Sequence, residues 1–187
     1  MSNAVKAIIL VLGSLSLLAI LGILSIVFLL YWSIPHVVTD VSQYSNILHH
    51  WPEKFEDPGS KELTKHFPDS IPPDATNARL AYFPGCLQAG SYFQVRFRLS
   101  PEKIRSLYQH FRAQAAYRFK GGYSSENTEK GEVLTTQFFT SDSEDRSFPE
   151  SYELLVLRSE GTWHMGRSCG VAIDRAANDI VYWVDTR

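Results

Sequence analysis

The sequence has few cysteines, no low-complexity tract and no internal repeat. Its two cysteines, Cys86 and Cys169, allow at most one disulfide within the chain, which excludes a cystine-rich scaffold. The missing repeats exclude a solenoid, and the high aromatic content argues against a disordered chain. The part of the chain after residue 32 is long enough for one domain with a core, so we expect a single folded domain there.

Charged side chains are absent from residues 7–32, which read AIILVLGSLSLLAILGILSIVFLLYW. As a helix, this segment would be about 39 Å long, more than the roughly 30 Å hydrocarbon core of a bilayer. A cleavable signal peptide has a shorter apolar region followed by small residues, whereas this segment ends in Tyr31 and Trp32, which suit the membrane interface. We therefore predict a retained transmembrane helix over residues 7–32.

The charges that flank this segment predict its direction. Lys6 precedes it, and the first basic residue after it is Lys54. By the positive-inside rule, residues 1–6 form a cytoplasmic tail and residues 33–187 lie outside the membrane. The expected localisation is the cell membrane, as a single-pass protein with an extracytoplasmic carboxyl-terminal part.

Such an exported domain meets an oxidising environment, in which a disulfide between Cys86 and Cys169 is permitted. A bridge over so long a loop would contribute about 4.5 kcal/mol on the chain-entropy model. The alternative is a pair of small buried thiols that never meet, because the spacing does not show that the two Cα atoms approach within about 7 Å. Both alternatives stay open at the level of the sequence.

Residues 33–76 hold most of the prolines of the chain, and we interpret them as a membrane-proximal lead-in rather than as part of the core. Asp40 is a suitable N-cap, and the helical spacing of the apolar residues after it predicts a short helix. A second helical turn after Ser60 is expected to bury Leu63 and Phe67.

The clearest strand and helix signals follow one another. In YFQVRFRL, residues 92–99, apolar side chains alternate strictly with polar ones, which predicts a half-buried strand whose wet face is basic. Next, Ser100 provides an N-cap, Pro101 occupies the first helical position and Glu102 places an acid in the first turn. The apolar stripe that follows predicts a helix to about Phe119.

Helices come early and strands dominate late, which predicts an α+β fold for residues 77–187. We expect a mainly antiparallel sheet of five or six strands, covered on one face by the helix that begins at Pro101. The other predicted strands are residues 77–83, 132–140, 151–158, 169–174 and 179–186.

The formal net charge is only -2, but residues 77–121 are strongly basic. Their basic side chains could form a positive surface for anionic lipid headgroups or envelope polymers. Alternatively, they pair within the fold with acids on neighbouring strands, as opposite charges across a sheet often do. The candidate ligand-binding residues are Arg96, Arg98, Lys103, Arg105 and Arg112.

Catalytic and metal motifs are weak. GRSCG, residues 166–170, matches the nucleophile elbow of hydrolases, but a β-rich segment follows it and no histidine lies beyond His164. His164 and Cys169 would be about 17 Å apart on an extended strand. No histidines have the spacing of ligands to one metal, so we predict no catalytic residue, metal or cofactor, and we expect no nucleic-acid partner.

Two segments, HFPDSIPPDATNARLAYFPGCLQAGSYFQVRFRLSPEKI at residues 66–104 and GVAIDRAANDIVYWV near the end, carry a resemblance. On them the chain resembles an uncharacterised family of bacterial proteins with an N-terminal membrane anchor or signal. The resemblance implies a bacterial source and one exported domain, and it supplies no catalytic residues.

Together these patterns favour a single-pass protein of the bacterial envelope whose outer domain is a non-catalytic binding or accessory module, for an anionic ligand or for another membrane protein. The alternative is an exported, hydrolase-like enzyme whose site is assembled from distant residues. A deep cleft lined by His164, Cys169 and acids would favour the enzyme, and a shallow basic face would favour binding.

Overall fold

The protein is described by a computed structural model. It divides into two compact units, Met1–His36 and Val37–Arg187. The described residues are 20–25, 28, 35–51, 60–85, 90–122, 133–139, 147–162 and 165–187.

In the first unit, residues 20–25 and 28 are helical. The large apolar side chains among them are more than half exposed, with Phe28 at 61%. The rest of the predicted membrane span, residues 7–32, lies outside the described residues. Among the residues that the structure describes, no helix is long and apolar enough to cross a membrane.

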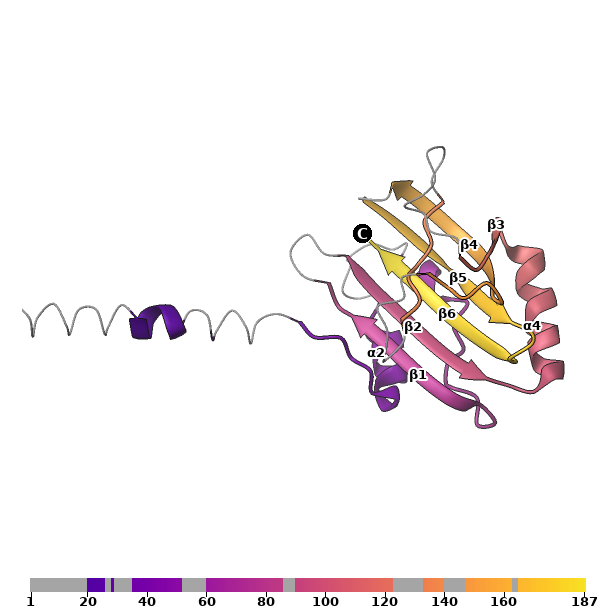
Figure 1. Cartoon of the computed structure of the whole chain (residues 1–187), viewed down its shortest axis with the longest axis horizontal. Coiled ribbons are helices and arrows are strands. Elements are labelled where there is room, and N and C mark those ends of the chain that lie inside the picture. The colour runs from indigo at the N-terminus through magenta and orange to yellow at the C-terminus, as the bar shows by residue number, and fades with distance from the viewer. Residues whose placement is uncertain are drawn as a thin grey trace, which may run out of the picture. The chain divides into compact units, whose positions relative to one another are not determined.

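The second unit is built on a six-stranded antiparallel sheet in the order β1-β2-β6-β5-β4-β3 (Figure 1). This confirms the predicted α+β fold and the antiparallel sheet. The strands are β1 (Thr76–Phe83), β2 (Ser91–Arg98), β3 (Tyr117–Lys120), β4 (Glu153–Thr162), β5 (Met165–Asp174) and β6 (Asp179–Thr186).

The alternation in β2 defines the two faces of the sheet. Phe93, Val95 and Phe97 are completely buried on what we call the first face. Gln94 and Arg96 point to the opposite, second face, because successive side chains of a strand alternate. β2 pairs with β6 along its whole length, which places this alternating segment in the interior of the sheet.

The first face is covered partly by the helix α4 (Pro101–Gln114), as predicted. The Ser100 side chain accepts a hydrogen bond from the Lys103 amide, and Pro101 occupies the first turn. The helix ends at Gln114, earlier than the predicted Phe119, and the chain turns extended to form β3. The pairing of β3 with β4 explains this difference, since it gives the backbone a ladder of hydrogen bonds in place of further helix.

The remainder of the first face is covered by the lead-in, which corrects the interpretation that residues 33–76 are not part of the core. Its elements are the 3-10 helix η1 (Val41–Gln43) and the helices α2 (Tyr44–His50) and α3 (Ser60–Thr64). Trp51 is 1% exposed, and the Phe67 ring stacks on Phe93 with centroids 5.0 Å apart. Leu63 and Phe67 are buried as predicted. The lead-in is needed there because α4 packs on β4 and β5, away from β1 and β2.

The second face is not solvated as the sequence suggested. Residues 133–139 cross it in an extended conformation without joining the sheet, so the strand predicted at residues 132–140 is not formed in its described part. Gln94, only 3% exposed, donates to Thr136 Oγ1 at 3.0 Å and to the Gln137 carbonyl. The side-chain amide of Gln94 thus holds residues 133–139 on the sheet, where the sequence predicted backbone pairing of a strand.

Candidate functional site

The five basic residues predicted to bind a ligand do not form one surface. Arg96 and Arg98 project from β2 toward the second face of the sheet, while Lys103, Arg105 and Arg112 lie on α4, which packs against the first face. The sheet therefore divides the predicted basic surface into two groups with different surroundings.

Arg96 belongs to an internal ion pair. Its Nη2 and Nε atoms lie 2.6 and 2.7 Å from Oδ2 of Asp179, a residue that is 1% exposed on the neighbouring strand β6. The Tyr152 hydroxyl donates to the same oxygen at 2.9 Å, and the guanidinium lies over the Phe138 ring at 5.1 Å. This arginine matches the alternative in which basic residues pair with acids inside the fold, and it is not available to a ligand.

Lys103 also has a partner within the domain. Its Nζ lies 2.7 Å from Oδ1 of Asp74, and the hydrogen bond from this ammonium lowers the pKa of the Asp74 carboxyl. Both side chains are about half exposed, so the pair contributes little to stability. It ties the segment before β1 to the first turn of α4. The other two lysine or arginine side chains of this helix, Arg105 and Arg112, have no ion pair with an acid of the described residues.

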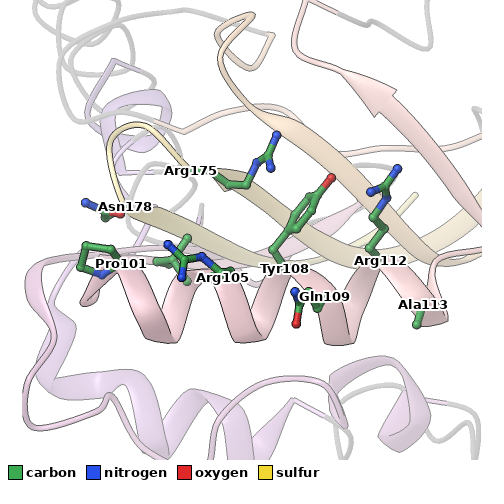
Figure 2. A pocket seen from close by; sticks show the side chains of 9 residues that line it. Pro101, Arg105, Tyr108, Gln109, Arg112, Ala113, Arg175 and Asn178 are labelled. Atoms are coloured by element: carbon green, nitrogen blue, oxygen red, sulfur yellow. The ribbon is translucent and has the colours of Figure 1, made fainter.

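Arg105 and Arg112 line an open hollow of about 670 Å³ beside α4. A third arginine, Arg175, reaches the same hollow from the turn between β5 and β6 (Figure 2). Tyr108 lies between the two α4 arginines in sequence, and Asn178 closes the end near the start of the helix. The hollow thus joins one face of α4 to a turn more than sixty residues later in the chain.

Local sequence explains how these side chains meet. Arg105, Tyr108 and Arg112 follow one another at spacings of three and four, so they share one face of the helix. The turn that carries Arg175 is fixed by Asp174, whose Oδ1 accepts hydrogen bonds from the amides of residues 176 and 177 at 2.9 and 3.0 Å. Asn178 then adopts φ 56°, a left-handed conformation that asparagine tolerates. The hairpin turn is therefore rigid where it presents its arginine.

The Tyr108 ring is the centre of the hollow. The Cζ atoms of Arg175 and Arg112 lie 4.5 and 5.6 Å from its centroid, both within the roughly 6 Å at which a cation interacts with an aromatic ring. The Tyr108 hydroxyl donates to Oε2 of Glu153 at 2.9 Å. Burial raises the pKa of this hydroxyl, and the hydrogen bond to Glu153 raises it further, so it remains protonated.

The three arginines of the hollow have no acid in ion-pair distance among the described residues, unlike several other basic residues of the domain. Arg158 and Arg167 both pair with Glu160, for example, at distances of 2.5 and 2.8 Å. Within the described part of the chain, no carboxylate lies within 4.0 Å of a guanidinium nitrogen of Arg105, Arg112 or Arg175. Three positive charges therefore gather at one exposed hollow without a direct ion pair to these residues.

Sequence reasoning found two of these arginines and missed Arg175. The predicted strands 169–174 and 179–186 leave a short connection at residues 175–178 between them, but nothing in this spacing shows that the connection lies beside α4. That proximity follows from the crossing of α4 from the end of β2 to β3 at the other edge of the sheet. The position of Tyr108 in the apolar stripe of the helix likewise hid its contact with two guanidinium groups.

The weak catalytic motif is buried in the sheet. Ser168 and Cys169 lie inside β5 and are 1% and 3% exposed, so GRSCG does not form the exposed strand-to-helix turn of a nucleophile elbow. Burial raises the pKa of the Cys169 thiol to about 12, which keeps it protonated and unreactive. Cys169 has a free thiol here. Because Cys86 lies outside the described residues, the disulfide stays a prediction. His164 also lies outside the described residues.

The described residues contain no group of three or more histidine, cysteine or acidic side chains placed to hold a metal ion. Comparison of the whole chain with protein-family models, with curated proteins and with solved structures finds no match. The resemblance to a family of anchored bacterial proteins therefore stays a prediction, and a function has to be argued from the hollow itself.

Proposed function

We propose that the chain is a single-pass membrane protein of the bacterial cell envelope whose outer α+β domain is a non-catalytic module that binds an anionic ligand in the hollow beside α4. The apolar segment 7–32 supports the anchor, and Lys6 before it supports an extracytoplasmic domain. The helical residues 20–25 within that segment expose large apolar side chains, as an anchor in lipid would.

The observation that carries the binding proposal is a set of three arginines in one hollow, Arg105, Arg112 and Arg175, for which the described residues offer no acid in ion-pair distance. Like charges held close together repel one another, and a bound anion relieves that repulsion. Guanidinium groups also offer planar pairs of N–H donors that match carboxylate and phosphate oxygens. The buried positions of Ser168 and Cys169 favour binding over a hydrolytic reaction at that motif.

An anchor would also raise the effective concentration of ligands at the membrane surface. The compact domain begins at Val37, five residues after Trp32 at the end of the predicted span. Short linkers of this kind confine the second binding event to a small volume, so even weak contacts to an anionic surface would be occupied. We therefore place the ligand of this module among anionic components of the envelope.

The test is retention of the full chain, in non-ionic detergent micelles, on an anionic column. We expect R105Q/R112Q/R175Q to elute at clearly lower salt than the parent chain, because the hollow would supply most of the contacts that salt weakens. The control is R98Q/R118Q/K120Q, which removes the same charge from exposed side chains outside the hollow. Equal elution of the two triple variants would refute binding at the hollow.

The proposed membrane topology has its own test. Protease added to spheroplasts should digest the carboxyl-terminal domain while a cytosolic marker stays intact. Protection of the domain to the same degree as the marker would contradict the extracytoplasmic assignment, and with it the envelope ligand.

A further inference from the structure

We infer that the hollow binds a phosphate group between the guanidinium groups of Arg112 and Arg175, and that Tyr108 is a positioning residue that holds these two arginines at the binding distance. This inference rests on the proposed function and names the ligand class for the same site.

The arrangement around the ring supports two-sided binding. Figure 2 shows Arg175 and Arg112 on either side of Tyr108, one from the β5–β6 turn and one from α4. Each guanidinium is held near the ring by a cation–π contact, at 4.5 and 5.6 Å from the centroid. Two arginines that start from different elements thereby contact the same ring, although their charges repel.

The ring itself is fixed from behind. Tyr108 is 7% exposed, and its hydroxyl is tied to Glu153 at the start of β4. A ring held in this way would keep both guanidinium groups ordered before a ligand arrives, which lowers the loss of side-chain entropy on binding. The Glu153 carboxylate binds the tyrosine hydroxyl, and among the described residues no acid lies within 4.0 Å of the guanidinium nitrogens of Arg112 or Arg175.

The number of charges favours phosphate over carboxylate. A phosphate monoester carries about -1.5 to -2 charges at pH 7 and offers three strong acceptor oxygens, so it can engage two guanidinium forks together. A carboxylate carries one charge, so a single bidentate arginine already neutralises it. The side-chain amides of Gln109 and Asn178 line the same hollow and can serve remaining oxygens or the group that bears the phosphate.

The openness of the hollow to solvent matches a phosphate carried on a larger molecule, and two sources share this chemistry. One is the headgroup of an anionic phospholipid in the membrane that would anchor the chain, and the other is a soluble phosphate monoester. Arg105 lies two helical turns from Arg112, roughly 10 Å along the axis, where it would contact a second anionic group or a neighbouring headgroup.

The experiment uses the full chain in maltoside micelles and measures dissociation constants by intrinsic fluorescence or calorimetry. The probes are inorganic phosphate, glycerol 3-phosphate, a short-chain phosphatidate mixed into the micelles, a zwitterionic short-chain phosphatidylcholine and the dicarboxylate glutarate. We expect inorganic phosphate and the two phosphate monoesters, glycerol 3-phosphate and phosphatidate, to bind at least tenfold more tightly than glutarate or the zwitterionic phosphodiester phosphatidylcholine. Phosphatidate tighter than glycerol 3-phosphate assigns the lipid source, and the reverse order assigns the soluble one.

Three variants test the positioning role. R112Q and R175Q should each weaken phosphate binding about tenfold or more, because each removes a charge-assisted pair. Y108F keeps the ring and should change binding less than threefold, whereas Y108L removes the platform and should weaken binding about tenfold. Thermal melts check that each variant folds. If Y108L does not fold, the surface variants R112Q and R175Q still test whether phosphate binds between these two arginines. R98Q, from the second face, serves as the matched control.

The outcomes separate the two levels of the proposal. If glutarate binds as tightly as phosphate, or a folded Y108L binds like the parent chain, the phosphate inference is overturned while anion binding at the hollow stands. If R105Q/R112Q/R175Q binds every probe as the parent does, the proposed function fails as well.

Discussion

Replacement of Asp185 by asparagine should stabilise the domain near neutral pH and leave it unchanged in acid. Asp185 lies on β6 under the segment 133–139 and is 7% exposed. Its carboxylate accepts a hydrogen bond from Thr136 Oγ1 at 3.1 Å and lies 3.3 Å from Nε of Arg187. Burial nevertheless dominates and raises its pKa from 3.8 to about 6, because these two contacts recover only part of the lost hydration.

The direction of the pH effect follows from linkage. Between pH 4 and 6 the folded state keeps the Asp185 proton that the unfolded state has lost, so stability falls as the pH rises through this window and is then constant. The rise of the Asp185 pKa from 3.8 to about 6 corresponds to a loss of roughly 3 kcal/mol in unfolding free energy across this window. Asparagine retains an acceptor for Thr136 but loses the attraction to Arg187, so we expect a net gain of about 1–2 kcal/mol at pH 7.5.

The assay is urea unfolding of a fragment spanning residues 37–187, followed by tryptophan fluorescence at several pH values. The difference in unfolding free energy between D185N and the parent should be near zero at pH 4, increase to about pH 6.5 and then level off. A difference that is flat with pH, or that shrinks as the pH rises, would refute the assignment of a buried carboxylate that resists ionisation.

Two further substitutions test the packing of the sheet. R96Q should lower the unfolding free energy by about 3 kcal/mol, because it leaves the buried carboxylate of Asp179 without its cation. The control R98Q, at an exposed position, should lower it by less than about 0.5 kcal/mol. Equal losses for the two variants in urea unfolding would contradict this account. G170A should destabilise by about 2 kcal/mol or more, since its Cβ would lie 2.4 Å from the Leu155 carbonyl oxygen of β4; a melting temperature equal to that of the parent would show that the strands can separate without cost.

Elements set by local pattern were predictable from the sequence. The strict alternation around Phe93 and the cap-and-proline signal at Ser100 identified a strand and a helix that the structure confirms. In both cases the sequence period equals the period of the structure, and no distant contact is needed to decide the outcome.

Elements decided by distant contacts were not predictable in the same way. Residues 133–139 have the composition of a strand, but they do not pair with the sheet. Instead, the side chains of Gln94 and Asp185 hydrogen-bond to Thr136 and hold this segment over the second face. The prolines of the lead-in suggest a segment outside the core. Because α4 covers only part of the first face, however, the aromatic side chains of the lead-in bury the rest of it. Arg96 pairs with a buried acid, whereas Arg112 lines the exposed hollow, because they lie on different sides of the sheet. A count of charges along the chain does not show on which side a residue lies.

The turn before β6 offers a prediction that separates geometry from charge. Asp174 is a buried acid next to a hollow that we propose binds anions, so electrostatics alone says that its removal should strengthen binding. Its Oδ1, however, accepts the two amide hydrogen bonds that fix the turn carrying Arg175. Asparagine keeps an oxygen for these amides, whereas alanine does not. We therefore expect D174N to bind phosphate as tightly as the parent or slightly more so, and D174A to bind it roughly three- to tenfold more weakly. If D174A instead gains affinity along with D174N, the turn does not hold Arg175 in place, and the preorganised site argued above loses its basis.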